Sequence, residues 1–211
     1  MDPQPTTYGP AEMTGLVLHP QTPRSLRVHE AALAATRELL REGGLAAAVT
    51  DAISARSGVS KATLYKHWPS RIAIAAEAYG RDMAEAVPDS HTGSALDDVR
   101  DQVRRTSAFY ASPEGLVYRE LVGACATDAG GAAYFRAYLL AGRRSAFKRL
   151  WLRAVESGEV RGDVDADIAT DLLFGPLLFR LMTGQRPLTP DTADAITDAA
   201  LQGLLPQPQE V

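Results

Sequence analysis

Hydrophobic and polar positions recur along the chain with the period of an α-helix. The first periodic stretch carries one apolar stripe, formed by Val28, Ala32, Ala35 and Leu39. This spacing places all members of the stripe on one face of a helix. Ser25 is expected to cap this helix, and the pair Gly43-Gly44 is expected to end it.

Two short helices are expected next, over about 51–57 and 61–67, and Ser70 is expected to cap a longer helix that runs to about Ala86. The rest of the chain is rich in alanine and leucine at helical spacing, with almost no β-branched alternation. Breaks with glycine, proline or serine fall at 112–113, 128–131, 157–158, 162–163, 184–190 and 206. The pattern predicts an all-α protein of about nine helices and no strand.

The helix expected over about 132–156 carries two apolar stripes. One stripe consists of Phe135, Leu139, Ala146 and Leu150, and the other of Leu140, Phe147, Trp151 and Val155. Two stripes require burial over a wide arc of the helix. We therefore expect this helix to lie at the centre of a helical body.

The segment 168–182, IATDLLFGPLLFRLM, is apolar almost all the way round a helix. Such a helix needs partners on two sides, which its own domain and a second subunit across a two-fold axis would supply. The last helix adds a stripe of Ala193, Ile196, Ala200 and Leu204. These patterns predict a homodimer through about 165–183 and 190–204, and the alternative is a buried hairpin within a monomer.

The composition is that of an ordinary globular protein: 211 residues, 45% hydrophobic and 23% charged. The single cysteine, Cys125, excludes an internal disulfide and fits a reducing cytoplasm. No apolar run approaches the roughly 18 residues of a membrane helix. We therefore expect a cytoplasmic protein with no membrane partner.

Charge is distributed unevenly along the chain. The whole protein carries −4, whereas residues 56–71 carry +4 and contain no acid. A short basic segment in an acidic protein indicates one face that binds a polyanion. Chance variation in charge is the alternative explanation.

The residues around this basic segment favour a helix-turn-helix. Gly58 supplies the positive φ that a tight turn needs, and Ser60 stands where the second helix requires an N-cap. Small residues that allow a close crossing are Ala52, Ala55 and Ala62, and a miniature core is expected from Ile53, Val59 and Leu64. In such a motif the first helix braces the second, which lies in the major groove of DNA.

The second helix carries polar and basic side chains that suit DNA. Lys61 and Ala62 are best placed to meet base edges. Contacts to phosphate are expected from Thr63, Tyr65, Lys66 and Arg71. The alternative is an incidental helix pair with a glycine turn and surface lysines.

Residues 58–71, GVSKATLYKHWPSR, closely resemble the signature of the TetR family, the tetracycline-repressor-like bacterial transcriptional regulators. The helix that ends in Arg41-Glu42-Gly43-Gly44 is similar to the first helix of the family, so the motif-level likeness covers about 25–79. The resemblance implies a DNA-binding domain at 25–71, a linking helix at 70–86, and a ligand-binding and dimerisation domain at 87–206. Residues 1–24, rich in Pro, Thr and Gln, are expected to form a disordered arm.

The resemblance also assigns roles to single residues. Lys61 and Ala62 would meet bases, and the DNA backbone would be met by Thr63, Tyr65, His67 and Arg71. A contact from Thr50 to phosphate is less secure, because Val49 stands where the family often has threonine. Asp51 would repel a phosphate, so we expect it either to face away from the DNA or to bias the choice of base.

A small-molecule cavity in the C-terminal domain is a further implication of the resemblance. Its expected lining is mostly aromatic and suits a mid-sized, largely apolar effector. The candidates are Phe109, Tyr110, Tyr118, Cys125, Tyr138, Phe147, Trp151 and Phe179. The alternative is that these side chains fill the core.

Enzymatic, cofactor and metal functions find no support in the motifs. The chain contains no HExxH, GxSxG, P-loop or CxxC, and its four histidines are scattered. Cys125 is either a redox sensor or an inert core residue. We expect a homodimeric repressor that a small molecule releases from a palindromic operator; the alternative is an all-α small-molecule-binding or enzymatic domain in which the basic hairpin is incidental.

Overall fold

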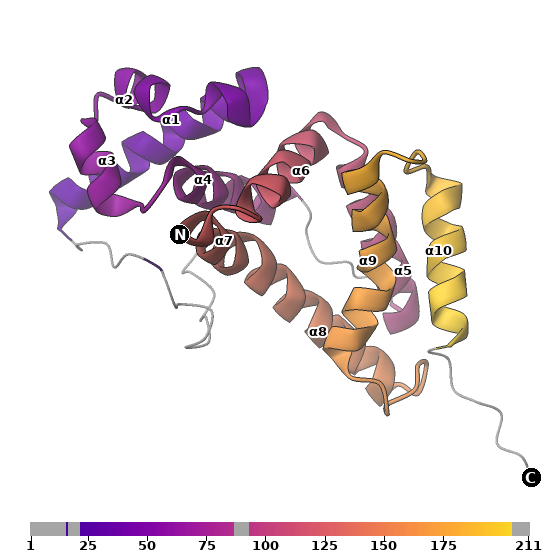
Figure 1. Cartoon of the computed structure of the whole chain (residues 1–211). Coiled ribbons are helices and arrows are strands. Elements are labelled where there is room, and N and C mark those ends of the chain that lie inside the picture. Colours follow the sequence, from indigo (N-terminus) through magenta and orange to yellow (C-terminus); the bar gives the residue numbers. More distant parts are fainter. Residues whose placement is uncertain (1–15, 17–21, 87–92, 204–211) are drawn as a thin grey trace, which may run out of the picture. The chain divides into compact units, whose positions relative to one another are not determined.

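The computed structural model describes residues 16, 22–86 and 93–203 (Figure 1). This part of the chain is helical and contains no strand, which confirms the predicted all-α class. The helices are α1 (Pro23–Ala47), α2 (Thr50–Ser57), α3 (Lys61–His67), α4 (Arg71–Ala86), α5 (Ala95–Tyr110), α6 (Pro113–Cys125), α7 (Ala129–Phe135), the π-helical turn η1 (Arg136–Leu140), α8 (Ala141–Glu156), α9 (Ala166–Thr183) and α10 (Pro190–Gln202). Because α7, η1 and α8 run on without a break, the described residues form 9 helical segments.

The chain divides into two compact units, each of which is described by itself. The N-terminal unit consists of residues 1–86 and 117–142, and the C-terminal unit of residues 87–116 and 143–211. The segment 117–142 thus packs with the N-terminal part, although the sequence suggested a C-terminal domain over 87–206. Of the arm expected at 1–24, residues 1–15 and 17–21 lie outside the described residues, and Pro23 and Arg24 already belong to α1.

The first helix begins earlier than expected. Thr22, not Ser25, is its N-cap, and the Ser25 amide donates to Thr22 Oγ1 at 3.2 Å. Pro23 fits the first turn because a proline there loses no helical hydrogen bond. At the other end the helix is interrupted as predicted, since Gly43 (φ −157°) and Gly44 (φ +63°) leave the helical region.

Helix α4 forms the core of the N-terminal unit, and residues 72–80 are all buried. It packs against α1 on one side and against α7 and η1 on another. The break expected at 128–131 is present but lies earlier, at 126–128, because α7 already starts at Ala129, with Asp128 as its N-cap. The Gly131 amide donates to Asp128 Oδ1 at 2.7 Å, and a Cβ on Gly131 would lie 2.5 Å from Ile72 Cγ2. Glycine here allows the close approach of α7 to α4 and does not end a helix.

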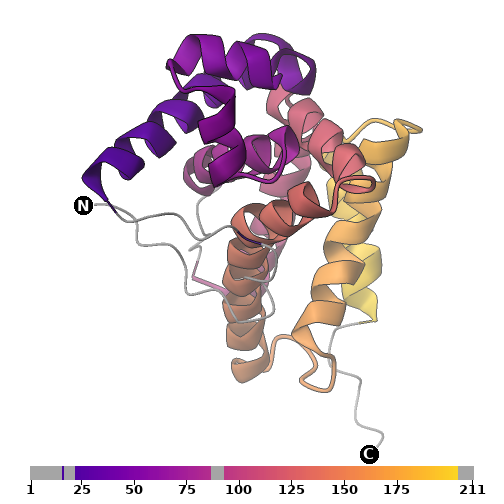
Figure 2. The ribbon, with the colours of Figure 1, turned by 60° about the vertical axis from the view of Figure 1, so that its left-hand side comes forward.

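In the C-terminal unit α5 packs against α9 and α10, which run beside each other in Figures 1 and 2. Asp165 caps α9, Gly184 ends it with φ +63°, and Thr189 caps α10. These ends lie close to the predicted limits of 165–183 and 190–204. The core of this unit is apolar and includes Val99, Val103, Leu173, Leu177 and Leu201.

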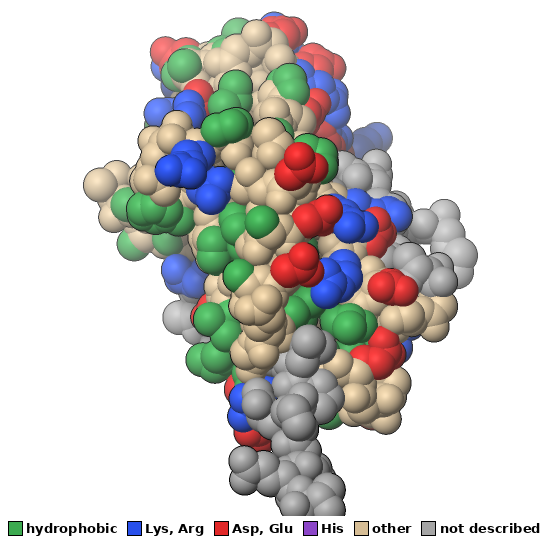
Figure 3. Space-filling model, turned by 90° about the vertical axis from the view of Figure 1, so that its right-hand side faces the viewer, with side chains coloured by type: hydrophobic (Ala, Val, Ile, Leu, Met, Phe, Trp, Pro, Cys, Tyr) green, Lys and Arg blue, Asp and Glu red, His purple; other side chains and the backbone are tan. Residues whose placement is uncertain are grey.

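One face of α9 is apolar and exposed. Its side chains are those of Ile168, Leu172, Phe179 and Met182. Figure 3, which looks onto the chain from the side of α10, shows hydrophobic side chains interspersed with acidic and basic ones. Within the described residues, no helix has both the length and the apolar character needed to cross a membrane.

Candidate nucleic-acid interface

Helices α2 and α3 form a hairpin with a tight left-handed turn at Gly58. This residue has φ +70°, and its amide donates to Ser54 O at 3.1 Å. A second bond across the turn joins Ser54 Oγ to Val59 O at 2.7 Å. Only glycine adopts this backbone conformation without strain, so the tight turn accounts for the presence of glycine at position 58.

The expected miniature core and cap are present. Ile53, Val59 and Leu64 are buried beneath the hairpin. The Thr63 amide donates to Ser60 Oγ at 3.2 Å, so Ser60 is the N-cap of α3. With its apolar side held in this way, α3 presents its other side to solvent.

Four of the predicted contact residues lie on that exposed side: Lys61, Ala62, Tyr65 and Lys66. Thr63 is half-buried, and its hydroxyl lies 2.9 Å from Ser60 Oγ. Lys66 has no carboxylate partner among the described residues. The exposed side therefore combines a free cation, a phenol and a small residue, which suits contact with a polyanion.

The first turn of α2 lies beside α3. Thr50 is half-buried, with its Oγ1 3.4 Å from the Tyr65 hydroxyl. The Asp51 carboxylate pairs with the Lys61 ammonium group. Asp51 is therefore turned toward the predicted reading residue and not away from it.

The prediction that His67 contacts the DNA backbone is wrong. Its side chain is only 5% exposed, and its ring lies 5.4 Å from the Trp68 ring and 5.8 Å from the His29 ring. The Tyr134 hydroxyl donates to His67 O at 3.3 Å. The spacing of Leu64, His67 and Trp68 (i, i+3, i+4) is that of one buried helical face, and this signal was available in the sequence.

A buried polar network fixes the residue that follows α3. Glu77 of α4 is 0% exposed, and Trp68 Nε1 donates to its Oε2 at 2.7 Å. Its Oε1 lies 2.7 Å from His29 Nε2 and accepts from Arg81 Nη2 at 2.9 Å. The His29 ring stacks on Trp68 at 4.4 Å. The network joins α1, α4 and the end of α3, and sequence reasoning missed it.

Arg71 is engaged inside the unit. Its Nη1 donates to Leu45 O at 3.0 Å, and the Leu45 amide donates to Glu120 Oε2 at 2.7 Å. The peptide groups on both sides of Leu45 are therefore held, one by α4 and one by α6. Arginine has five N–H donors, so the predicted phosphate contact of Arg71 stays a prediction.

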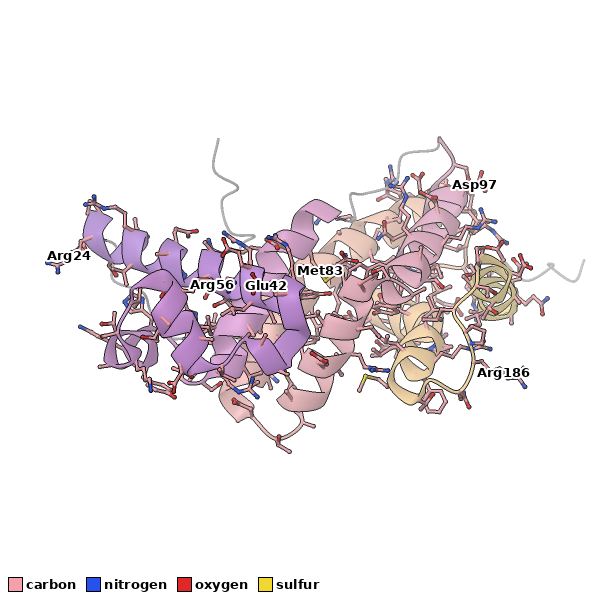
Figure 4. The ribbon with its side chains drawn as sticks, turned by 90° about the horizontal axis from the view of Figure 1, so that it is seen from above. Arg24, Glu42, Arg56, Met83, Asp97 and Arg186 are labelled. Carbon is pink, nitrogen blue, oxygen red and sulfur yellow. The ribbon has the colours of Figure 1, made fainter. Side chains whose placement is uncertain are left out.

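Arg56 contributes to the +4 of the basic segment but is already neutralised. Its Nη1 donates to Glu42 Oε1 at 2.7 Å, and the two side chains lie beside each other in Figure 4. This hydrogen bond lowers the pKa of Glu42 and raises that of Arg56. The pair joins α1 to α2 and involves no residue of α3.

The candidate ligand-binding residues are divided between the units. Tyr118, Cys125 and Tyr138 belong to the N-terminal unit, and the C-terminal unit holds Phe109, Tyr110, Phe147, Trp151 and Phe179. Phe109, Tyr110, Tyr118, Phe147 and Trp151 are buried, and Tyr138 and Cys125 are half-buried. Phe179 differs, because it is 57% exposed on the outer face of α9 and lines no enclosed part of its own unit.

Most of these aromatic rings pack against other rings. Phe147 meets Phe174 edge to face at 5.0 Å, and Tyr118 lies 5.5 Å from Phe135. Neither Phe174 nor Phe135 was among the candidates. The Trp151 Nε1–H group is buried, and no acceptor lies within hydrogen-bond distance among the residues that the structure describes. An unpaired buried donor is rare, so Trp151 stands apart from an ordinary core residue.

Cys125 has little thiolate character. Burial, together with the negative charge of Asp128, raises the pKa of its thiol to about 11. The thiolate is the reactive form of cysteine, and at neutral pH very little of it is present here. In 22–86 and 93–203, no three or more His, Cys, Asp and Glu side chains are grouped so that they could hold a metal ion.

Comparisons with known proteins agree on one family. The family model described as "Bacterial regulatory proteins, tetR family" matches residues 32–78, and the model described as "Tetracyclin repressor-like, C-terminal domain" matches residues 87–200. The uncharacterised HTH-type transcriptional regulator YdeS of Bacillus subtilis is 32% identical over 183 residues, which cover 87% of this chain and 88% of YdeS. Another such regulator, Rv1556 of Mycobacterium tuberculosis, is 29% identical over 182 residues, covering 85% of this chain and 86% of Rv1556.

Solved structures with the same fold include the TetR family transcription regulator SCO0332. It has a TM-score of 0.73 and 32% identity, over 85% of this chain and 100% of SCO0332. The flavonoid-responsive regulator FrrA shares the fold with a TM-score of 0.60 and 21% identity, over 86% of this chain and 99% of FrrA. This chain therefore belongs to the TetR family of transcriptional regulators, and its α2–α3 hairpin is the helix-turn-helix of that family.

Proposed function

We propose that this regulator is a homodimeric repressor that binds a palindromic operator through α3 and leaves it when a small molecule binds. The observation that carries the proposal is the exposed side of α3, where Lys61, Ala62, Tyr65 and Lys66 stand over a buried hairpin core. A short helix held in this way, with a free cation and a phenol outward, has the chemistry of a recognition helix.

Within this proposal the exposed residues divide into two groups. Lys61 and Ala62, in the first turn of α3, meet base edges. Phosphate contacts come from Thr50, Thr63, Tyr65, Lys66 and Arg71, of which Lys66 supplies an unpaired charge. The corresponding functional domains are 25–71 for DNA, with the linking helix 70–86, and 87–206 for ligand and dimer.

The dimer is proposed from the outer face of α9. Ile168, Leu172, Phe179 and Met182 are large apolar side chains on one exposed helix face, a feature that marks protein contact surfaces. Next to them a groove of about 420 Å³ is lined by residues of both last helices and of the loop between them, including Arg180, Pro187, Thr192, Ala195 and Ile196. A second copy would cover this face across a two-fold axis. The dimer would then have two recognition helices, one for each half-site of a palindromic operator.

The effector site is proposed in the C-terminal unit. The buried Trp151 Nε1–H group and the buried Ser107 hydroxyl have no hydrogen-bond partner among the described residues. A largely apolar effector with a hydrogen-bond acceptor would satisfy such a donor. Two regulators that share the fold support this class of ligand: FrrA is named as flavonoid-responsive, and FadR of Bacillus subtilis was solved with stearoyl-CoA.

Selection from a library of random-sequence duplexes tests DNA binding, followed by titration of the enriched duplex at several salt concentrations. Lys66→Gln should weaken binding to every sequence and reduce the log–log salt slope by about 0.9, because one phosphate contact is lost. Lys148→Gln is the matched control, since Lys148 is also an exposed lysine but lies on α8. Equal effects of the two substitutions would contradict the docking through α3.

Sedimentation tests the dimer with another matched pair. Leu172 on α9 is 47% exposed and Leu152 on α8 is 46% exposed. Leu172→Asp should produce monomers with weak binding to the palindrome, because a charge in an apolar interface is costly. Leu152→Asp should leave the dimer intact. A dimer that survives Leu172→Asp would overturn the proposed interface.

A thermal-shift and release assay tests the effector with a flavonoid and an acyl-CoA as probes. A bound probe should raise the melting temperature and lower operator affinity, as linkage requires. Trp151→Phe should weaken both responses by removing the N–H donor. Responses equal to those of the original chain would show that Trp151 does not hold the effector.

A further inference from the structure

An acidic residue sits on the surface where a DNA-binding protein is expected to be basic. Asp51, in the first turn of α2, pairs with Lys61, in the first turn of α3. The two side chains are 74% and 55% exposed, so both remain accessible to a third partner.

The position of Asp51 is defined by a second contact. Thr50 and Asp51 are neighbours on α2, and they meet Tyr65 and Lys61, which lie one turn apart on α3. The two contacts bring the beginning of α2 alongside the exposed side of α3. The carboxylate therefore stands next to the residues that are proposed to read the bases.

To folding stability Asp51 contributes little: a carboxylate in the first turn of α2 interacts favourably but weakly with the helix dipole, and the exposed ion pair with Lys61 adds only a small further contribution. For binding to phosphates alone, Asp51 is unfavourable. It neutralises Lys61, one of two lysines on the exposed side of α3, and it repels the DNA backbone. A residue that weakens non-specific binding in this way would improve discrimination between sequences.

The pair presents a donor and an acceptor side by side. In the major groove a G·C pair shows the acceptors N7 and O6 on guanine and an amino donor at N4 of cytosine. The ammonium group of Lys61 matches the guanine acceptors, and the carboxylate of Asp51 matches the cytosine amino group. An A·T pair shows a different order in this groove, with the acceptor N7 and the amino donor N6 on adenine followed by the acceptor O4 and the methyl group of thymine. Only the G·C pair therefore offers two adjacent acceptors to the ammonium group with an amino donor beyond them for the carboxylate.

We propose that Asp51 is a specificity-determining residue that reads a G·C pair of each half-site together with Lys61 and suppresses binding to other DNA. The inference rests on the proposed function, because it requires the exposed side of α3 to enter the major groove. On DNA the Asp51–Lys61 contact stays in place, and both groups turn their remaining hydrogen-bonding capacity to the base pair.

The test compares the original chain with Asp51→Asn and Lys61→Gln in selection from random-sequence duplexes. The original chain should enrich half-sites that contain one dominant G·C pair. Asp51→Asn should lose the preference at that pair by roughly 5- to 150-fold, the range expected for one base contact. On a duplex without the enriched motif, Asp51→Asn should bind more tightly, with a salt slope steeper by about 0.9 because Lys61 becomes free.

Two further variants act as controls. Glu42→Gln removes the same charge from an exposed ion pair, that with Arg56, and should leave the enriched motif unchanged. The double variant Asp51→Asn with Lys61→Gln should not gain the steeper slope, because the lysine that Asp51 neutralises is gone.

The outcomes separate this inference from the proposed function. If Asp51→Asn enriches the same motif with the same salt slope, the role of Asp51 is overturned while the DNA-binding proposal stands. If the original chain enriches no sequence, both are overturned.

Discussion

The two units place their charged residues differently. In the N-terminal unit Glu77 is completely buried and meets Trp68, His29 and Arg81. Both units also carry ion pairs at the surface, such as Arg56–Glu42 in the N-terminal unit and, in the C-terminal unit, Arg144, which pairs with Asp167 and Asp171 at 3.0 and 2.9 Å. Asp98 is a buried exception there, and its partner Arg153 is 47% exposed, comparable to the 40% of Arg81 in the Glu77 network.

The buried network and the surface ion pairs have different effects: the network favours one orientation of α3, whereas the surface pairs have little effect on orientation or on stability. A buried carboxylate is tolerated only when its donors stand in a defined geometry, so the Glu77 network favours one arrangement of α1, α4 and the end of α3. Surface ion pairs impose no such requirement and contribute little energy. We interpret the buried network as the means by which the N-terminal unit presents α3 in one orientation.

The largest expected effect follows from breaking the buried network. Glu77→Ala should lower the free energy of unfolding by about 3–5 kcal/mol, because it removes the acceptor of the buried Trp68 and His29 side chains, while Arg81 is partly exposed and keeps Glu30. Urea unfolding measures this loss. Glu77→Gln keeps one acceptor oxygen and should lose less. A loss below about 1 kcal/mol for Glu77→Ala would show that the buried network contributes no more to stability than a surface ion pair does.

A smaller effect is expected where α7 approaches α4. Gly131→Ala should cost about 1–3 kcal/mol, since the new methyl group would lie 2.5 Å from Ile72 Cγ2 and force a shift. Gly123→Ala is the matched control, because a Cβ at Gly123 in α6 meets no atom within 4 Å. That change should be neutral or stabilise the helix by up to about 1 kcal/mol. Thermal unfolding should therefore show a lower melting temperature for Gly131→Ala and an unchanged or higher one for Gly123→Ala.

The surface pairs of the C-terminal unit should respond much less. Arg144→Gln should lower the free energy of unfolding by less than about 1 kcal/mol, because its partners Asp167 and Asp171 remain hydrated when it is lost. The difference should shrink further in high salt, which screens exposed charges. A loss as large as that of Glu77→Ala would show that the two units do not differ in this respect.

The smallest expected effect concerns Glu159 at low pH. Hydrogen bonds from Ser157 and Ser94, together with the backbone amides of Leu96 and Ala95, lower the pKa of this carboxyl from 4.5 to about 2. Because the folded value lies below the unfolded value, the stabilisation is complete above about pH 4.5 and is lost as the pH falls toward 2. Unfolding curves of Glu159→Gln and the original chain should therefore differ by a constant amount near neutral pH and converge in acid. Curves that run parallel down to pH 2 would refute the assignment.

Helix ends were predictable because their causes are local. Gly58, Ser60, Asp165 and Gly184 each act within a few residues, through backbone conformation or through a hydrogen bond to the adjacent turn. The hydrophobic period was sufficient for the all-α class. The exposed residues of α3 followed from the same local reasoning.

Errors arose where a distant segment decides the role of a residue. His67 has a polar side chain that suits DNA, but Trp68 and His29 enclose it. In the sequence Gly131 suggests the end of a helix. In the structure it is a glycine because Ile72 leaves no room for a Cβ at this position. Glu77 offered a usable signal, because it is the one acidic residue in the apolar run IAIAAEAYG, where an acid is tolerated only if it is paired.

Residues 117–142 belong to the same compact unit as residues 1–86, and this has a consequence for engineering hybrid regulators. A hybrid that takes its DNA-binding part from another protein and joins it at residue 86 would separate Leu45 from Glu120 and Ile72 from Gly131. The incoming part would then meet a foreign α6 and α7 at these contacts. An exchange that carries 117–142 along with 1–86 keeps both contacts within one donor sequence, and it places the joints inside α6 and at the start of α8.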